Sequence, residues 1–133
     1  DRRGVTISIP EAGVFAVGND ELSDAARDLM AQVASTVADF PNELLVEGHA
    51  DNVPIRTSRF RSNWDLSAAR ASRVVEFLIE RGIDPGRLSA TGYGEFRPRV
   101  ANDSPASRAV NRRVDVVIAT PDATSLPSVG SAP

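Results

Sequence analysis

Two stretches in which apolar residues recur at helical spacing, each preceded by a short strand-like segment, constrain the fold of this chain most. Residues 21–39 and 65–81 place apolar side chains three or four positions apart, which predicts two amphipathic helices. Residues 5–9 alternate apolar and polar side chains, and residues 44–50 form a second strand-like segment. Helices with one apolar face that follow strands are expected to pack on a sheet, so the chain is predicted to belong to the α/β class.

Two further strand-like segments follow the second helix, at residues 88–93 and 114–119. The element order is then β-α-β-α-β-β. This order predicts a two-layer sandwich, in which a mixed sheet is covered on one face by the two main helices. A short helical turn is expected at residues 105–110, a short strand at 14–16, and an irregular connection at 52–62.

Local signals predict where the two helices begin and end. Asn19 or Asp20 is expected to cap the first helix, because a short polar side chain can accept a hydrogen bond from a first-turn amide. Pro41 ends that helix, and Gly82 is a natural residue just beyond the second. The apolar stripe of the second helix is expected to contain Leu66, Val74, Val75, Leu78 and Ile79.

Length and composition bound the organisation of the chain. Its 133 residues suit one domain, predicted at residues 1–120. Residues 121–133, PDATSLPSVGSAP, have no apolar period and are predicted to form a disordered tail. A net charge of −3 argues against nucleic acid as a partner. The absence of cysteine excludes disulfides, thiol catalysis and cysteine zinc sites.

The membrane signals are negative within this sequence. No run of about 18 apolar residues is present, so no segment is expected to span a membrane. The chain starts DRRG, with no methionine and no apolar signal segment. We therefore expect a fragment of a longer protein, attached to a membrane only through an anchor that would lie upstream.

Three sequence blocks carry more specific information. Residues 48–52 read GHADN, residues 63–71 read NWDLSAARA, and residues 111–114 read NRRV. They resemble the GHTD, N-x-x-L-S-x-x-R-A and NRRV-type blocks of the OmpA C-terminal-like family, in the same order. The resemblance covers residues 5–119 and implies the OmpA-like two-layer fold. Several independent blocks at coherent spacing are more specific than any one of them.

Within that family, the chain is most similar to MotB-type flagellar stator subunits. DNVPI at residues 51–55 and the run FRSNWDLSAARA at 60–71 resemble the GHTDNxPI and F-x-SNW-x-LSAARA phrasing of that subgroup. Ala50 departs from the pattern, since the family usually has threonine there. The lost hydroxyl would remove one hydrogen bond, worth about 1 kcal/mol.

The resemblance implies binding to the peptide stem of peptidoglycan, usually through meso-diaminopimelate. By motif, Asp51 and Arg70 then form a ligand clamp, because a carboxylate and a guanidinium match the ammonium and carboxylate of a zwitterion. The family also implies Asn63, Leu66 and Arg112 as members of the pocket. Without the resemblance, charge and spacing favour a structural salt bridge between Asp51 and Arg70.

Several neighbouring side chains have two interpretations. Asn63 can cap the helix or brace the loop instead of contacting a ligand. One of Arg112 and Arg113 is expected to contact the ligand and the other to be solvated. Trp64 is expected to pack at the start of the helix rather than to stack on a glycan. A structural role is expected for Tyr93, and a solvated loop for Arg56, Arg59 and Arg61.

The sequence offers little support for a catalytic site or a metal site. The chain is therefore predicted not to be an enzyme and not to bind a cofactor. Glu47, His49 and Asp51 are expected on one strand face, but His49 is the only histidine, so no metal site is predicted. Ser62 and Ser67 lack the sequence of a nucleophile elbow. No pair of carboxylates is expected to converge on a sugar ring.

The leading hypothesis is a periplasmic domain of an inner-membrane protein that binds peptidoglycan non-covalently and anchors a flagellar motor stator to the cell wall. The resemblance implies a homodimer, and a MotA-like partner subunit that is reached through N-terminal segments outside this sequence. One alternative is a general OmpA-like envelope tether or lipoprotein module outside the motor. A second is a protein-interaction module that has lost wall binding, which Ala50 makes more plausible.

Overall fold

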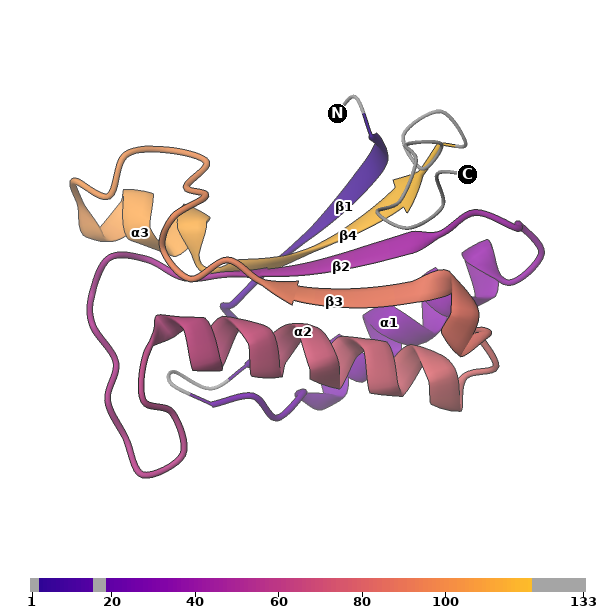
Figure 1. The fold of residues 1–133 in the computed structure, drawn as a ribbon, viewed down its shortest axis with the longest axis horizontal. Helices are drawn as coiled ribbons and strands as arrows, with labels where there is room; N and C mark the ends of the chain where they lie inside the picture. The colour runs from indigo at the N-terminus through magenta and orange to yellow at the C-terminus, as the bar shows by residue number, and fades with distance from the viewer. Residues whose placement is uncertain (1–2, 16–18, 121–133) are drawn as a thin grey trace, which may run out of the picture.

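A four-stranded mixed sheet forms one layer of the molecule (Figure 1). In this computed structural model, which describes residues 3–15 and 19–120, the strands are β1 (Gly4–Pro10), β2 (Leu44–His49), β3 (Leu88–Gly92) and β4 (Arg113–Ala119). Their order across the sheet is β1-β4-β2-β3. β4 is antiparallel to both β1 and β2, whereas β2 and β3 are parallel, as a strand-helix-strand connection requires.

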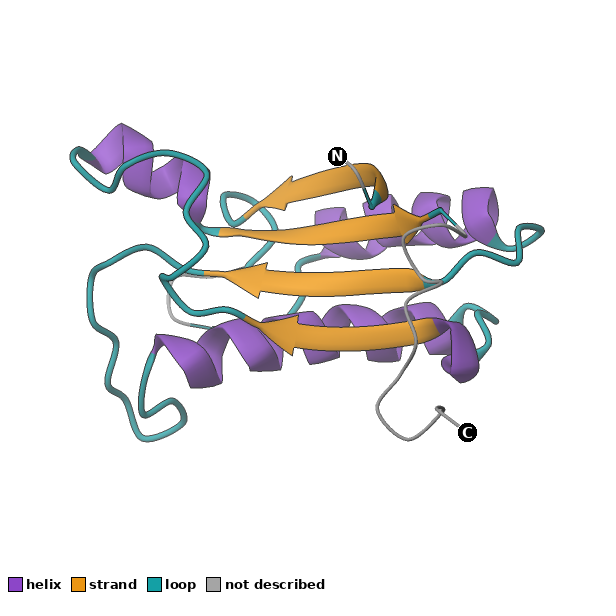
Figure 2. Ribbon diagram, turned by 45° about the horizontal axis from the view of Figure 1, so that its top comes forward, coloured by secondary structure: helices purple, strands orange, loops and turns teal. Residues whose placement is uncertain are grey.

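Two helices form the second layer, α1 (Asp24–Val37) and α2 (Asn63–Glu80). Both lie on the same face of the sheet (Figures 1 and 2). The core between the layers is apolar: Leu44 and Val46 of β2 and Val114 and Val116 of β4 are almost fully buried there. The predicted two-layer α/β fold with a mixed sheet and helices on one face is confirmed.

Glycines allow α2 to lie unusually close to the sheet. Gly48 of β2 and Gly92 of β3 are partners in the parallel register. A Cβ at Gly48 would lie 2.0 Å from the carbonyl oxygen of Ser67, and a Cβ at Gly92 would lie 2.4 Å from the amide nitrogen of Ala68. Since backbone atoms cannot yield to such contacts, only glycine fits at both positions. This close approach sets the first half of α2 against the ends of β2 and β3.

The helix caps correct one prediction. Ser23, not Asn19 or Asp20, is the N-cap of α1, and its hydroxyl accepts a hydrogen bond from the amide of Ala26. Asn19 and Asp20 lie in the preceding loop, where Asn19 accepts a hydrogen bond from the amide of Glu21. The predicted cap was therefore placed one turn too early. At the end of α2, Gly82 adopts a positive φ of 96° just beyond the helix, as predicted.

The smaller elements agree with the sequence in most places. A 3-10 turn at Pro85–Arg87 precedes β3, and the expected short helix is α3 (Pro105–Asn111). Ile79, expected in the apolar stripe of α2, is 38% exposed, and Phe77 is buried instead. The strand predicted at residues 14–16 is reduced to an isolated bridge between Phe15 and Leu22, and Ala16 lies outside the described residues.

The ends of the chain limit two further predictions. Residues 121–133, predicted as a disordered tail, lie outside the described residues. Within the described ranges, no helix combines the length and the apolar character needed to cross a membrane.

Candidate functional site

A cavity of about 380 Å³ lies where β2 ends and α2 begins. Side chains reach it from the loop after β1, from the loop after β2, from the first turns of α2 and from the residue before β4. The predicted site residues Asp51, Asn63, Leu66, Arg70 and Arg112 all line it. The other lining residues are Glu11, Ala50, Val53, Pro54 and Ile55.

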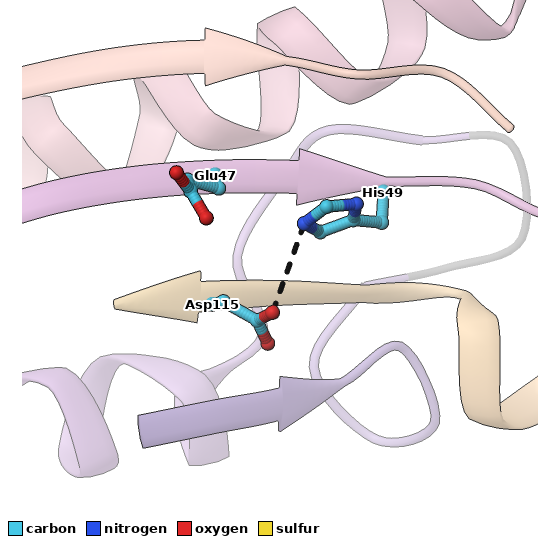
Figure 3. Close-up of side chains that lie close together, drawn as sticks. All are labelled: Glu47, His49 and Asp115. Atoms are coloured by element: carbon cyan, nitrogen blue, oxygen red, sulfur yellow. Dashed lines mark ion pairs between the residues drawn. The ribbon is translucent and has the colours of Figure 1, made fainter. Parts of the chain in front are cut away.

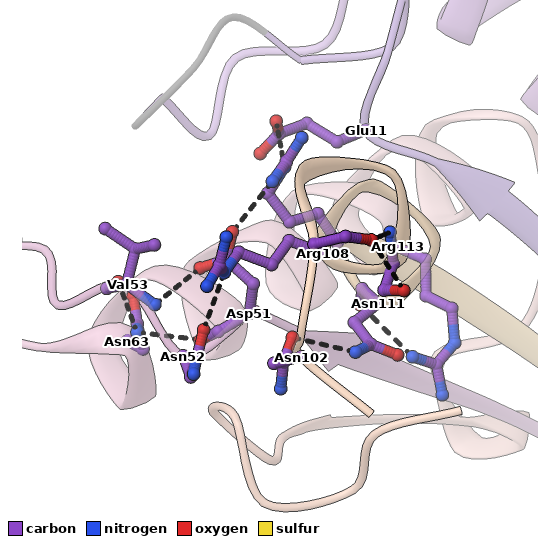
Figure 4. Close-up of polar contacts among 12 residues, drawn as sticks. Glu11, Asp51, Asn52, Val53, Asn63, Asn102, Arg108, Asn111 and Arg113 are labelled. Atoms are coloured by element: carbon purple, nitrogen blue, oxygen red, sulfur yellow. Dashed lines mark hydrogen bonds and ion pairs between the residues drawn. The ribbon is translucent and has the colours of Figure 1, made fainter. Parts of the chain in front are cut away.

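Four charged side chains form a continuous chain of ion pairs along this cavity. Figure 4 labels its two carboxylates, Glu11 and Asp51. Arg70 Nη1 donates to Glu11 Oε2 at 2.6 Å, and Arg112 Nε donates to Glu11 Oε1 at 3.0 Å. Arg112 Nη1 then donates to Asp51 Oδ2 at 2.7 Å. Two carboxylates and two guanidiniums alternate, so their formal charges cancel. Asp51 and Arg70 thus have Arg112 and Glu11, respectively, as their ion-pair partners.

The two guanidiniums differ in exposure. The Arg70 side chain is only 4% exposed, donates through Nε to the carbonyl of Asn19 at 2.7 Å, and lies over the ring of Phe15. The Arg112 side chain is 32% exposed. Its hydrogen bond to Asp51, aided by the charge of Glu11, raises its pKa above the usual arginine value. Arg112 is therefore the more accessible of the two guanidiniums, while Arg70 lies in the buried wall of the cavity.

Asn63 has the bracing role that the sequence left open. Its side-chain amide donates to the backbone carbonyls of Asp51 at 3.2 Å and Val53 at 3.0 Å. The amide of Val53 in turn donates to Asp51 Oδ1 at 2.9 Å. Ser62, rather than Asn63, is the N-cap of α2. These bonds hold the loop after β2 in the shape that directs the Asp51 carboxylate into the cavity.

Glu11 is a residue of the cavity that sequence reasoning missed. It lies just after β1, is 7% exposed, and receives bonds from both guanidiniums of the cavity. Its backbone amide also donates to the carbonyl of Arg112 at 2.9 Å. The available signal was the pairing of β1 with β4, in which Pro10 is opposite Arg113 and brings Glu11 beside Arg112. No short motif marks this neighbour, because β1 and β4 are more than 100 residues apart.

The arrangement can hold a small group that carries both charges. Asp51 lines the cavity with a carboxylate and Arg112 with a guanidinium, while Leu66, Pro54 and Ile55 supply apolar contact. A charge-assisted hydrogen bond from a ligand ammonium or carboxylate would be worth roughly 1.5–3 kcal/mol.

The comparisons with known proteins agree with these blocks and this fold. A profile described as the OmpA family matches residues 14–112. The chain belongs to the OmpA family. The match includes Asp51, Asn63, Leu66, Arg70 and Arg112, so each residue predicted by motif lies within the family's region.

Individual relatives of the chain include motility proteins. Motility protein B of Bacillus subtilis is 36% identical over 86% of this chain, which spans 45% of that protein. Peptidoglycan-binding protein ArfA of Mycobacterium bovis is 32% identical over 84% of this chain, which spans 34% of that protein. The periplasmic domain of Helicobacter pylori MotB superposes with a TM-score of 0.82 at 29% identity, covering 91% of this chain and 79% of that one. The expected likeness to MotB-type proteins is confirmed.

A second polar cluster lies on the face of the sheet opposite α1 and α2, which we call the open face. It corrects the prediction that Glu47, His49 and Asp51 share one strand face. Glu47 and His49 of β2 point there, and Asp115 of β4 joins them (Figure 3). Asp51, predicted with them, lies beyond the end of β2 and lines the cavity on the helix side. The strand alternation ends at His49, so the side chain of Asp51 no longer follows it.

Arg113 also differs from its prediction. It is 7% exposed rather than solvated, and it donates to Asp115 Oδ2 at 3.1 Å. Burial lowers its pKa, while the Asp115 carboxylate opposes that effect. Tyr93 has the expected structural role, because its ring stacks on His49 at a centroid distance of 5.3 Å.

The remaining candidates make contacts within the fold. Trp64, at the start of α2, is 50% exposed, and its ring stacks on that of Phe96 at a centroid distance of 5.2 Å. Arg59 pairs with Asp20 at 2.7 Å. Ser67 is buried, and its hydroxyl accepts a bond from the amide of Gly94.

Proposed function

We propose that this domain binds peptidoglycan non-covalently through the cavity at the end of β2. The observation that carries the proposal is the alternating row of Arg70, Glu11, Arg112 and Asp51, which places both kinds of charge along one cavity. The OmpA-family relative named as a peptidoglycan-binding protein supports the ligand class.

The proposed anchor is the free end of diaminopimelate in the peptide stem, which carries an ammonium and a carboxylate on one carbon. The ammonium would bind Asp51, and the carboxylate would bind Arg112. Arg70 would act from the buried wall of the cavity. It pairs with Glu11, which in turn holds Arg112 in place, and it adds positive potential to the wall. Leu66 would contact the methylene chain, and Asn63 keeps the loop that carries Asp51 in position.

The proposed wider role is to anchor a flagellar motor stator to the cell wall from the periplasm. Its support is the likeness to Motility protein B and to the periplasmic domain of MotB. In this role the domain would be part of an inner-membrane protein and would work as a homodimer beside a MotA-like subunit. Two weak sites on one dimer would bind a repeating wall far more tightly than one site.

Co-sedimentation with insoluble peptidoglycan tests the ligand. We expect Asp51→Ala and Arg112→Ala to reduce binding about tenfold or more, since each removes one charge-assisted contact. Arg70→Ala should also lose binding, with a loss of stability that urea unfolding will detect. Asp39→Ala and Arg73→Ala are matched controls at exposed positions outside the cavity. Equal sedimentation of all these variants would contradict the proposal.

The wall chemistry provides a second arm of the same experiment. Lysine-type stems keep the ammonium but lack the second carboxylate, so they should bind about 10–100-fold more weakly than diaminopimelate-type stems. Equal binding to both would remove diaminopimelate as the anchor while leaving wall binding intact.

A general envelope tether outside the motor is the second candidate. It is favoured by the relative ArfA, which is named for peptidoglycan binding and not for motility. Both candidates use the same cavity, so the sequence upstream separates them. One membrane helix with an acidic residue favours the motor, and a barrel or a lipoprotein signal favours the tether.

A further inference from the structure

The open face of the sheet holds a cluster that wall binding does not use. Glu47, His49 and Asp115 each offer one ligand atom, and these atoms lie within 4.8 Å of one another (Figure 3). All three residues are about 5% exposed. Glu47 and Asp115 are direct partners across β2 and β4, so two carboxylates oppose each other on one face. Such a like-charge pair is unfavourable by itself, and the guanidiniums of Arg3, Arg99 and Arg113 pair with its members.

His49 supplies an independent sign that a ligand is expected here. Among the described residues, neither of its buried ring nitrogens has a hydrogen-bond partner. A buried polar atom without a partner costs about 1–3 kcal/mol, so such atoms are rare unless they serve a function. The ring is stacked on Tyr93, and its Nε2 faces Asp115 Oδ2 at 3.7 Å. That separation is close to the roughly 3.3 Å between two ligands of a tetrahedral zinc ion with bonds of about 2.0–2.1 Å.

We propose that Glu47, His49 and Asp115 form a binding site for a divalent transition-metal ion of the Zn²⁺ type. One imidazole nitrogen and two carboxylate oxygens suit Zn²⁺, whereas Mg²⁺ and Ca²⁺ prefer oxygen ligands alone. Three protein ligands leave a fourth position for water. The ion would join β2 to β4 on the face of the sheet opposite α1 and α2.

The carboxylates share their oxygens with several neighbours. Arg3 pairs with Glu47 Oε2 and Arg113 donates to Asp115 Oδ2, while Asp115 Oδ1 accepts from Ser8 Oγ at 2.7 Å and lies 3.5 Å from Arg99 Nη2. Each carboxylate oxygen has two lone pairs, so one oxygen can accept from a guanidinium and still bind a metal. The cluster opens into a cavity of about 260 Å³, which provides a path for the ion.

Zinc titration of the chelator-treated protein, without a histidine tag, tests the site. We expect calorimetry to give one bound Zn²⁺ per chain and no comparable binding of Mg²⁺. His49→Gln should weaken zinc binding by at least about tenfold, since losing even an outer hydrogen-bond partner of a metal ligand costs roughly 10–100-fold. Glu47→Gln and Asp115→Asn should weaken it as well. Glu80→Gln and Asp39→Asn are matched controls at exposed positions and should leave it unchanged.

A spectroscopic readout on the unmodified chain does not depend on whether the variants fold. His49 is the only histidine, so the imidazole ¹⁵N resonances in an NMR spectrum belong to it alone. Zinc should shift the signal of one ring nitrogen until one equivalent has been added. Unshifted imidazole signals, or the same zinc affinity in a folded His49→Gln variant, would overturn the proposal.

Discussion

The two charged regions near the ends of β2 and β4 are built from similar residues but differ in how their polar side chains are paired. In the cavity on the helix side, Glu11, Asp51, Arg70 and Arg112 each have a charged partner within 3.0 Å. On the open face, the carboxylates also have arginine partners, but both ring nitrogens of His49 lack a hydrogen bond among the described residues. The first region has each of its charges paired, whereas in the second the described residues provide no hydrogen bond to the ring of the histidine.

The difference begins at the end of one strand. His49 is the last residue of β2 and points to the open face, whereas Asp51, two residues later, lines the cavity under α2. The loop between them is bound to Gly94 through the amide of Ala50 and to Asn63 through the carbonyl of Asp51. Residues that share a face in an unbroken strand are therefore assigned to two separate sites.

Among the substitutions that test this difference, Glu11→Gln is expected to have the largest effect on stability. Glu11→Gln removes the carboxylate that pairs with Arg70 Nη1 at 2.6 Å, and the Arg70 side chain is 4% exposed. We expect a loss of about 3–5 kcal/mol in the free energy of unfolding, because one partner of a buried ion pair is removed. Urea unfolding measures it.

The matched control for Glu11 is the same substitution on the other face. Glu47 is equally buried, but its partner Arg3 is 42% exposed and keeps its contact with water. Glu47→Gln should therefore cost only about 1 kcal/mol or less. Equal losses for the two variants would contradict the assignment of Arg70 to a buried wall.

The next effect is a pH dependence that belongs to the open face. Burial, together with the charge of Arg113, lowers the pKa of His49 to about 4, although Asp115 and Glu47 oppose the shift. The unfolded chain protonates its histidine near pH 6.5 and the folded chain does not, so stability is complete above about 6.5 and falls as the pH drops towards 4. The total loss is about 3 kcal/mol.

Chelator-treated protein and His49→Gln, unfolded at several pH values, isolate this contribution. The difference in slope between the two proteins from pH 6.5 to 5 reports His49, since most carboxylates are ionised in that range. Proton NMR of the single histidine measures its pKa directly. A pKa near 6.5 would show that His49 is as well hydrated as a surface histidine and would contradict this prediction.

The smallest of these effects concerns the packing that separates the two regions. Gly48→Ala would place a Cβ against the Ser67 carbonyl and push α2 away from β2, which should cost about 1–3 kcal/mol. Gly86→Ala is the control, since its Cβ would meet only the Asp84 side chain at 3.4 Å. If Gly48→Ala moves α2, peptidoglycan binding should fall while zinc binding on the other face is retained.

Much of the fold follows from local patterns. Alternating residues predict β1, β2 and β4, and the 3.6-residue period predicts α1 and α2, because these patterns reflect which side of each element is buried. The errors lie where tertiary contacts compete with local signals. Three short polar residues precede α1, and the bonds of Ser23 to Gly13 and Ala26 select it as the cap.

By itself, the sequence determined the two-layer architecture and, through the family blocks, the five predicted residues that line one cavity. The partners of those residues were decided only by the tertiary structure. Glu11 lies beside Arg112, and so near Arg70, because β1 pairs with β4 although the two strands are at opposite ends of the sequence. Asp115 takes the place predicted for Asp51 beside His49 because β2 also pairs with β4. Local patterns encode the burial of each element, but charge pairing depends on strand register, which joins residues that are distant in the chain.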